Sequence, residues 1–224
     1  MLIQRVIVAG GSGLVGSAVL EQLISDTDFI EVHAVVRRPI TDAPPRIRQH
    51  IVDFAKIAEW EIWKQFDEHP VANTVILCCL GTTLDLAGSE EQYRRVDHDI
   101  PIELGRVGLL HGVNHFVAIS SAGLNKRAPN HFMRAKIDLE RDLKDLGYRS
   151  LSIVRPSLIL GQRTASRPLE KIAAFFMRPL SIIIPPRWRA VHDWQVARAM
   201  IEVSMDPHVG VQIIPNERIA TLKN

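Results

Sequence analysis

The chain has 224 residues, enough for one large domain or for one domain with a small appendage. Hydrophobic residues make up 46% of the sequence and charged residues 23%, which is typical of a globular protein and excludes fibrous, collagen-like and disordered chains. The 27 basic and 25 acidic side chains leave a formal net charge of +2, too small to favour nucleic acid or an anionic membrane surface as the partner.

The two cysteines, Cys78 and Cys79, are adjacent within an apolar run. Neighbouring residues are too close for an ordinary disulfide, so we expect buried, reduced thiols. No apolar stretch approaches the ~18 residues that a membrane span needs. Residues 1–20 superficially resemble a signal peptide, but glycines and Arg5 interrupt them, and we interpret them as a strand, a turn and a helix. We therefore expect a cytoplasmic protein.

Short apolar runs rich in β-branched residues alternate with longer helical patterns. The runs predict strands at 6–9, 32–36, 74–79, 116–119 and 151–154, and the patterns predict helices at 14–24, 57–66, 90–110 and 131–146. Continuous hydrophobicity is typical of parallel strands that are covered on both faces. The alternation predicts a doubly wound α/β sheet, in which right-handed crossovers bring the carboxyl ends of the strands to one edge.

From Gly161 onward the pattern changes. A loop at 161–167 is expected to lead into an apolar helix around 169–176, and prolines then interrupt regular structure. A helix at 194–203 and a strand at 211–214 follow. We expect residues 1–224 to form a single domain, in which 161–224 contribute a small lobe on the substrate side of the sheet edge.

A glycine-rich segment separates the first predicted strand from the first predicted helix. Glycines at 10, 13 and 16 allow a tight turn, close approach of a diphosphate to the backbone, and close packing of the helix on the strand. The helix N-terminus adds unpaired N–H groups and partial positive charge. Glycines also mark ordinary turns, but this context favours dinucleotide binding. The binding segment comprises Gly10, Ser12, Gly13, Leu14, Val15 and Gly16.

Two arginines follow the second predicted strand, where an acidic residue for an adenosine ribose is usual. Arg37 and Arg38 suit a 2′-phosphate, which predicts NADP(H) in preference to NAD(H). A solvated pair of arginines at the strand end is the alternative. Asp53 is either an acceptor for the adenine amine or an exposed turn residue.

Lys136 interrupts the apolar face of the predicted helix at 131–146. A buried ammonium group needs a partner or a path to solvent. Lys136 therefore either reaches solvent near the start of the helix or points at a cofactor in the cleft. Ser120 and Ser121 follow the strand at 116–119, where hydroxyl groups would face a ligand.

Together these features resemble the short-chain dehydrogenase/reductase superfamily, in its atypical branch with a Gly-x-x-Gly-x-x-Gly turn. Within that branch the chain is most similar to the oxidoreductases related to the HIV Tat-interactive protein, along nearly its whole length. The matching segments are CCLGTT at 78–83, RRVD at 94–97, SS at 120–121, RPS at 155–157, SRP at 166–168 and VARAM at 196–200. The resemblance implies a Rossmann fold and a single NAD(P)-binding domain.

The resemblance also implies roles for individual positions. The glycine turn would hold the diphosphate, Arg37 and Arg38 the 2′-phosphate, and Lys136 the nicotinamide ribose. Ser121, directly before Ala122-Gly123, matches the catalytic serine, and Ser120 is the weaker candidate. The positions expected to border the adenosine and its ribose are Leu80, Gly81, Thr82 and Thr83. The positions expected to lie beside the nicotinamide are Arg155, Pro156 and Ser157.

One departure from the family pattern concerns the active-site pair Tyr-x-x-x-Lys, which reads Phe132 to Lys136 here. The phenol that exchanges a proton with the substrate is absent, and such transfer contributes roughly 10²–10⁴ in rate. Tyr93 and Tyr148, the two tyrosines of the chain, lie on the preceding predicted helix and in the turn before 151–154. Neither is predicted to replace the missing phenol, which leaves water or another hydroxyl as the donor.

Two functions follow from these observations. The first is an NADP(H)-dependent oxidoreductase for a small carbonyl or alcohol substrate, in which Ser121 polarises the oxygen and Lys136 anchors the cofactor. The second is an NADP(H)-binding regulatory or sensor protein with little catalysis and a protein partner. Epimerase chemistry is a weaker alternative, because it also needs the tyrosine. No metal site is expected, and the sequence identifies neither the substrate nor the oligomeric state.

Overall fold

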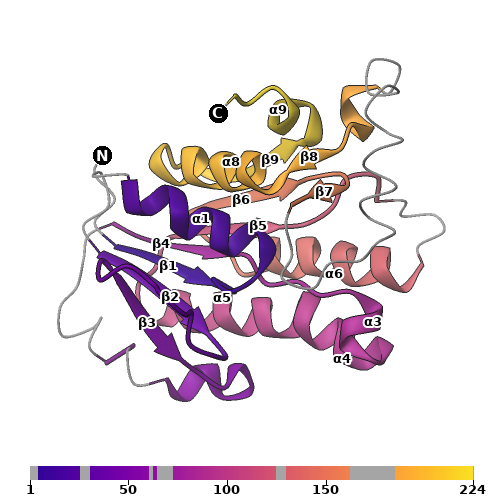
Figure 1. Ribbon diagram of the computed structural model, residues 1–224. Helices are drawn as coiled ribbons and strands as arrows, with labels where there is room; N and C mark the ends of the chain where they lie inside the picture. The colour runs from indigo at the N-terminus through magenta and orange to yellow at the C-terminus, as the bar shows by residue number, and fades with distance from the viewer. Residues whose placement is uncertain are drawn as a thin grey trace.

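The computed structural model describes residues 5–25, 31–60, 63–64, 73–124, 130–161 and 185–223. Within these residues, seven parallel strands form one sheet in the order β3-β2-β1-β4-β5-β6-β9, and their arrows point to the same edge (Figure 1). The strands are Arg5–Ala9 (β1), Glu31–Val36 (β2), Ile47–Ile51 (β3), Thr74–Cys78 (β4), His115–Ile119 (β5), Ser150–Arg155 (β6) and Gly210–Pro215 (β9). The order reverses between β1 and β4, as in a doubly wound Rossmann fold, so the predicted fold class is confirmed.

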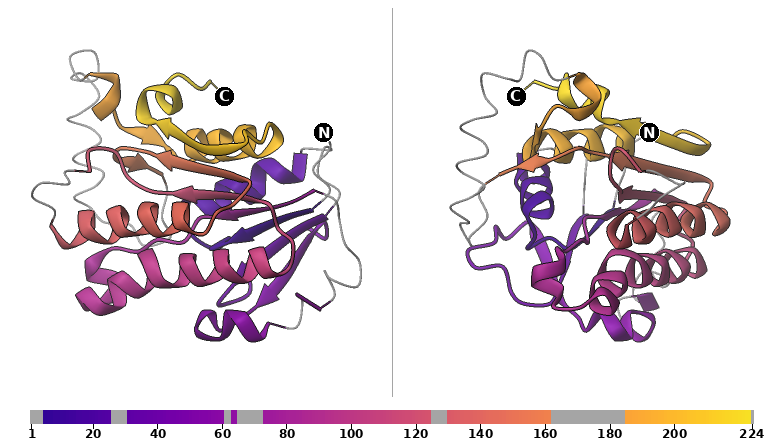
Figure 2. Two further views of the ribbon diagram at one scale, coloured as in Figure 1. Left: turned by 180° about the vertical axis from the view of Figure 1, so that it is seen from behind. Right: turned by 90° about the vertical axis from the view of Figure 1, so that its right-hand side faces the viewer.

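Helices cover both faces of the sheet. Helices α1 (Leu14–Ser25) and α8 (Asp193–Met205) pack together over one face, where alternate strand residues such as Val6 and Val8 are buried. Helices α5 (Ile100–Leu110) and α6 (His131–Asp145) cover the other face, against Ile7 and Ala9. Figure 2 shows this second pair side by side, in magenta and salmon. Because every residue of β1 is buried, the strand has the almost wholly apolar sequence of a central parallel strand.

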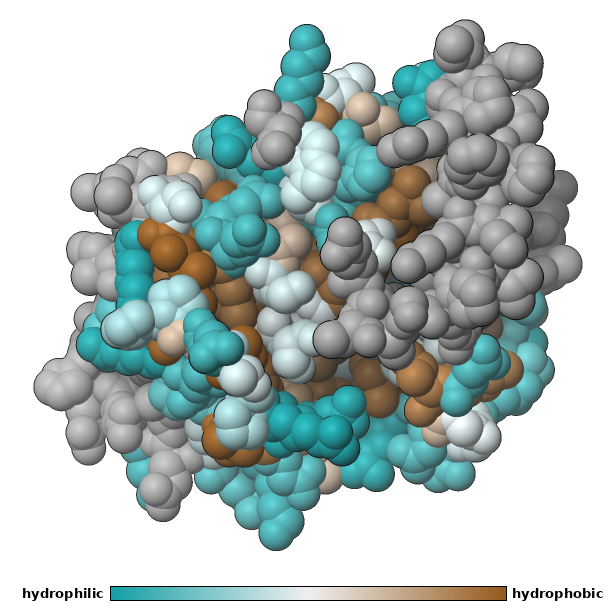
Figure 3. Space-filling view, viewed as in Figure 1, coloured by the Kyte–Doolittle hydropathy of each residue, from teal (hydrophilic) through white to brown (hydrophobic). Residues whose placement is uncertain are grey.

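Short elements connect these layers. They are the 3₁₀-helix η1 (Phe54–Glu59), α3 (Leu84–Ala87), α4 (Glu90–Arg94), the π-helical turn η2 (Arg95–Asp99), β7 (Ile159–Leu160), the 3₁₀-helix η4 (Pro186–Trp188), β8 (Val191–His192) and α9 (Asn216–Ala220). The strands β7 and β8 form a separate two-stranded pair. On the face shown in Figure 3, hydrophilic and hydrophobic residues are interspersed. None of the helices in the described ranges has the length and hydrophobicity of a membrane span.

Most predicted boundaries agree with the structure to within two residues, but three elements differ. Strand β3 was not predicted, because it is a sheet edge whose centre is polar (Arg48, Gln49 and His50). The helix predicted at 57–66 is confirmed only in part: η1 ends at Glu59, Trp60 is extended, and residues 63–64 are helical again. The helix predicted at 90–110 is helical throughout but contains the π-helical turn η2.

The C-terminal part of the chain joins the main domain. Strand β9 pairs with β6, and α8 packs on α1. The helix predicted around 169–176 and most of the loop predicted at 161–167 lie outside the described residues.

Candidate active site

The glycine turn between β1 and α1 has the close packing that its sequence predicts. Gly10 has a φ of +82°, and a Cβ there would lie 3.1 Å from the Cys79 carbonyl. A Cβ on Gly16 would lie 2.2 Å from the Gly10 carbonyl oxygen. Ser12 and Gly13 are exposed, and the first turn of α1 carries no acidic residue. A bare backbone at a helix N-terminus whose first turn lacks acidic residues fits a diphosphate.

The two arginines of the β2 carboxyl end lie next to this turn, since the Gly10 N–H donates to the Val35 carbonyl at 3.1 Å. Arg37 and Arg38 are exposed. Neither forms an ion pair with any residue in the described ranges. Their charges are therefore available to a phosphate.

Asp53 has a local structural role. Its carboxylate accepts a hydrogen bond from the Ala55 N–H at 2.9 Å and caps η1. The side chain is exposed and lies two residues after β3, so its second oxygen is open to an adenine amine.

The loop after β4 lies across from the glycine turn, because the Cys79 N–H donates to the Ala9 carbonyl at 2.9 Å. Leu80 and Gly81 lead to Thr82, whose N–H donates to Asp97 Oδ2 at 2.8 Å. Thr83 caps α3 by accepting from the Leu86 N–H. A carboxylate from another helix thus holds the loop expected to border the adenosine.

Lys136 is buried rather than directed along the surface. Its Nζ lies 2.8 Å from Asp97 Oδ1 and 3.2 Å from the Ile119 carbonyl oxygen. Lys136 and Asp97 are only 4% and 2% exposed. An ammonium group has three N–H donors, so one remains for a ribose hydroxyl. The alternative in which Lys136 reaches solvent is therefore wrong.

Asp97 is one site residue that sequence reasoning missed. Its carboxylate joins Lys136 to the Thr82 loop, and so connects two parts of the expected nucleotide site. It lies in the RRVD segment, but no role followed from that match. The available signal was Lys136 itself, because a lysine on an apolar helix face calls for a carboxylate on the neighbouring helix.

A π-helical turn places Asp97 in this position. In η2 the Ile100 N–H donates to the carbonyl of Arg95, five residues earlier, and Asp97 and His98 are both buried. Such turns insert an extra residue into a helix and are frequent at functional sites.

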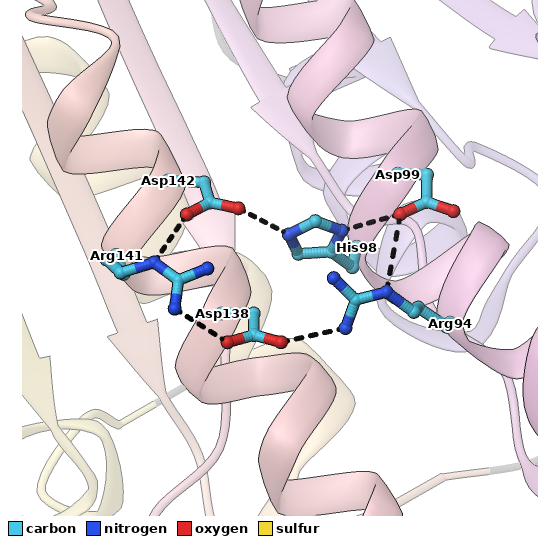
Figure 4. A network of polar contacts seen from close by, with 6 residues as sticks. All are labelled: Arg94, His98, Asp99, Asp138, Arg141 and Asp142. Carbon is cyan, nitrogen blue, oxygen red and sulfur yellow. Dashed lines mark hydrogen bonds and ion pairs between the residues drawn. The ribbon is translucent and has the colours of Figure 1, made fainter.

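A polar network holds α4 and η2 against α6 (Figure 4). His98 Nε2 lies 2.8 Å from Asp142 Oδ2, and His98 Nδ1 lies 2.6 Å from Asp99 Oδ1. Arg94 reaches Asp138 at 2.8 Å, and Arg141 binds Asp138 and Asp142 at 3.0 and 2.7 Å. The network fixes the spacing of the two helices that carry Asp97 and Lys136.

The two serines after β5 have different partners. Ser120 is 4% exposed and donates to Glu140 Oε1 at 2.6 Å. Burial raises the pKa of Glu140, but hydrogen bonds from Arg155 and Ser120 outweigh it and hold this pKa below its usual value. Ser121 is half-buried, and its Oγ contacts only the Ala122 carbonyl, at 3.2 Å, among the described residues. Ser121 is thus the hydroxyl that is open to a substrate.

The segment after β6 is held firmly beside these serines. Arg155 forms two bonds to Glu140, at 2.7 and 2.5 Å, and the Pro156 carbonyl accepts from the Ala122 N–H at 2.8 Å. The Ser157 N–H donates to Asn216 Oδ1 at 2.8 Å. Hydrogen bonds therefore hold the segments that follow β5 and β6 against each other.

The turn at η4 packs against the segments that follow β5 and β6. Asn216, 1% exposed, donates to the Pro186 and Arg189 carbonyls at 2.8 Å each. A Cβ on Gly123 would lie 2.3 Å from Trp188 Cζ3, so the indole rests on this glycine, two residues after Ser121. Trp188 is 48% exposed. Sequence reasoning missed Asn216, an isolated polar residue with no motif around it.

Phe132 lies in the first turn of α6 and is 43% exposed. Its ring centroid is 5.9 Å from that of Tyr93, which the sequence did not place beside it. The Tyr93 hydroxyl is buried and has no hydrogen-bond partner among the described residues. Burial and the Asp97 charge raise the pKa of this phenol. The hydroxyl of Tyr148, by contrast, donates to the Gly105 carbonyl at 2.6 Å.

Known structures share this architecture. MoeE5 in complex with UDP-glucose and NAD superposes with a TM-score of 0.69 at 16% identity, over 93% of this chain and 74% of that chain. The UDP-glucose 4-epimerase of Thermus thermophilus in complex with NAD gives a TM-score of 0.69 at 16% identity, over 97% and 81%. At these identities the similarity establishes the fold alone.

Sequence relatives establish the family. Protein HTATIP2 of Rattus norvegicus is 31% identical over 226 residues, covering 98% of this chain and 89% of its own length. Protein fmp52, mitochondrial, of Emericella nidulans is 30% identical over 174 residues, covering 77% and 74%. The model of the NAD dependent epimerase/dehydratase family matches residues 6–178. The chain therefore belongs to the NAD dependent epimerase/dehydratase family, with HTATIP2 and the FMP52 proteins among its relatives.

Proposed function

We propose that this protein is an NADP(H)-dependent oxidoreductase that acts on a small carbonyl or alcohol substrate. The observation that carries the proposal is the buried Asp97 carboxylate, which joins Lys136 to the Thr82 loop beside the glycine turn. A buried lysine, a held loop and a bare helix N-terminus at one sheet edge suit a dinucleotide better than a purely structural role.

The glycine turn, from Gly10 through Gly16, would hold the diphosphate. The remaining N–H donor of Lys136 would bind the nicotinamide ribose, and the segment 155–157 would lie beside the nicotinamide ring. When bound, the nicotinamide supplies or accepts the hydride. Ser121 would donate a hydrogen bond to the substrate oxygen, because Ser120 is occupied by Glu140.

The preference for NADP(H) over NAD(H) rests on Arg37 and Arg38. Both guanidinium groups are exposed next to the glycine turn, where a 2′-phosphate would lie. Asp53 would accept from the adenine amine with the oxygen that does not cap η1.

The test is a titration of the protein with NADPH and with NADH, followed by an NADPH-oxidation assay with a panel of aldehydes and ketones. We expect tighter binding of NADPH and turnover of at least one carbonyl compound. Binding of neither nucleotide would remove the cofactor assignment, whereas binding without turnover would remove only the oxidoreductase assignment.

Phe132 favours a second candidate, a nucleotide-binding regulatory protein with little catalysis. The pair Phe132–Lys136 keeps the cofactor lysine but lacks the phenol of the family pattern. Tight NADPH binding without consumption, together with a protein partner retained only in the presence of NADPH, would support this candidate. Efficient turnover by the wild type would reject it.

We also propose a cytoplasmic location and a substrate-side role for residues 161–224. Two reduced thiols, one of them buried, are consistent with a reducing compartment, although the FMP52 relatives are named as mitochondrial. Microscopy of the tagged protein tests the location. For the lobe, Trp188 rests directly over the Ser121 loop. Its replacement by alanine is expected to change KM.

A further inference from the structure

We propose that Tyr93, on α4, provides the active-site phenol that Phe132 cannot provide on α6. This inference rests on the proposed oxidoreductase function and assigns the proton donor of that reaction. It begins from a buried hydroxyl group that forms no hydrogen bond within the described part of the chain. An unsatisfied buried donor of this kind is rare and calls for a partner.

The placement of Tyr93 follows from two helical faces that meet. Tyr93 and Asp97 are four residues apart on the continuous α4–η2 segment, and Phe132 and Lys136 are four residues apart on α6. The Tyr93 and Phe132 ring centroids are 5.9 Å apart, and Asp97 Oδ1 lies 2.8 Å from Lys136 Nζ. The Asp97 carboxylate, which pairs with the Lys136 ammonium group, also lies close enough to the Tyr93 phenol to raise its pKa.

The polar network of Figure 4 holds α4 and η2 in a fixed position relative to α6. Arg94, directly after Tyr93, binds Asp138 at 2.8 Å, and His98, directly after Asp97, binds Asp142 at 2.8 Å. These contacts fix α4 and η2 to α6 at the residue that follows Tyr93 and at the residue that follows Asp97. The phenol is thus held at a set distance from the position of Phe132.

The Tyr93 hydroxyl is available as a proton donor. Tyr148 has its hydroxyl committed to the Gly105 carbonyl at 2.6 Å, so Tyr93 is the tyrosine of the chain whose phenol lacks a partner among the described residues. The Tyr93 phenol is protonated at neutral pH, as a tyrosine of ordinary or raised pKa is. Phe132, which contacts it, is 43% exposed, and exposed side chains change rotamer rapidly. We infer that the Phe132 ring turns aside when a substrate oxygen reaches the phenol.

In the reduction, the hydride and its electron pair pass from the reduced nicotinamide to the carbonyl carbon. The π pair of the carbonyl group moves onto its oxygen. The O–H bond of Tyr93 breaks, and its proton joins that oxygen to give the alcohol. Water then returns a proton to the phenolate. An alkoxide is a stronger base than a phenolate, so this transfer runs downhill even from a phenol of raised pKa.

The variant Tyr93→Phe tests the assignment, because it removes a hydroxyl that forms no hydrogen bond of normal geometry with a described residue, although the Asp97 carboxylate is near enough to raise its pKa. We expect an unchanged melting temperature and an unchanged NADPH Kd, but a loss of ~10²–10⁴ in kcat. The matched control is Tyr148→Phe, which removes a bonded hydroxyl. It should lower the melting temperature by about 2–4 °C and leave kcat unchanged.

The double variant Tyr93→Phe/Phe132→Tyr restores a phenol on α6 and should regain most of the lost turnover. Wild-type kcat in Tyr93→Phe would overturn the assignment. An inert wild type that binds NADPH and becomes active through Phe132→Tyr would also overturn it, with the nucleotide site intact. Failure to bind NADPH would instead reject the proposed function, and with it this assignment.

A second measurement observes the phenol directly instead of the rate. In protein labelled with [13Cζ]tyrosine, the two tyrosine signals can be assigned with the Tyr148→Phe variant. Addition of NADP+ with a carbonyl compound from the panel that is turned over should shift the Tyr93 signal and leave the Tyr148 signal in place. Equal shifts, or a stationary Tyr93 signal, would contradict contact of this phenol with the substrate.

Discussion

Asp97 and Lys136, which are 39 residues apart in the sequence, form a buried ion pair between η2 and α6, with 2.8 Å between Oδ1 and Nζ. The second oxygen of Asp97 holds the Thr82 N–H at 2.8 Å. One carboxylate therefore stabilises the fold and positions two parts of the proposed nucleotide site. A single substitution at Asp97 can test both effects.

Asp97→Asn removes the partner of a buried ammonium group. Breaking such a pair typically costs about 3–5 kcal/mol of unfolding free energy. We expect a large loss of stability in denaturant titration. We also expect weaker NADPH binding, since the Asp97 carboxylate no longer positions Lys136 and the Thr82 loop. Glu202→Gln, in the exposed pair with Arg198 at 3.1 Å, is the control and should cost about 1 kcal/mol or less. Equal losses in the two variants would contradict the role of Asp97.

Arg37→Ala and Arg38→Ala should weaken NADPH binding far more than NADH binding. A charge-assisted hydrogen bond contributes about 1.5–3 kcal/mol, so each variant should raise the NADPH Kd by roughly 10- to 150-fold. Calorimetric titration with both nucleotides measures the difference, and Arg198→Ala serves as the exposed control on α8. If the two nucleotides weakened equally, the arginines would be a solvated pair only.

Ser120 and Ser121 should separate stability from activity. Ser120→Ala removes a buried hydrogen bond to Glu140 and should cost ~1 kcal/mol of stability, because Arg155 still pairs with the carboxylate. Ser121→Ala should leave the melting temperature unchanged and lower kcat about 10²-fold, as for loss of one donor to a developing oxyanion. The reverse assignment of effects would make Ser120 the active-site serine.

Stability should fall as the pH drops from 6.5 toward 4. Burial lowers the pKa of His115 from 6.5 to about 4, and burial, followed by the neighbouring His50, lowers the pKa of His33 to about 4. Between these values the unfolded chain binds protons that the folded chain does not. Each histidine then removes ~1.4 kcal/mol per pH unit, and this loss ends near pH 4.

Denaturant titrations across this pH range measure the slope. His115→Leu should flatten it by the contribution of one histidine, since this ring is buried and its Nε2 has no partner among the described residues. His208→Leu, an exposed position before β9, should leave it unchanged. A slope indifferent to His115→Leu would exclude this histidine as a source.

The sequence allowed most of the fold to be predicted, because central strands such as β1 and β4 are buried on both faces and have an unambiguous apolar pattern. Strand β3 could not be recognised, since an edge strand with polar residues lacks that pattern. The glycine turn could be recognised because the spacing of its glycines is a local pattern, set by contacts between residues close in sequence. The partners of Lys136, Ser120 and Phe132 were not found, because each contact joins segments whose relative position only tertiary packing sets.

The central claim is that a pyridine nucleotide binds along the carboxyl edge of this sheet, with its diphosphate at the glycine turn. The most direct measurement is calorimetric titration of the wild type and of Gly16→Ala with NADPH. The Cβ of the variant would lie 2.2 Å from the Gly10 carbonyl oxygen and displace the turn. We predict saturable binding to the wild type and a large loss in the variant. A wild type that releases no heat with NADPH or NADH, or a variant that binds equally well, would contradict the claim.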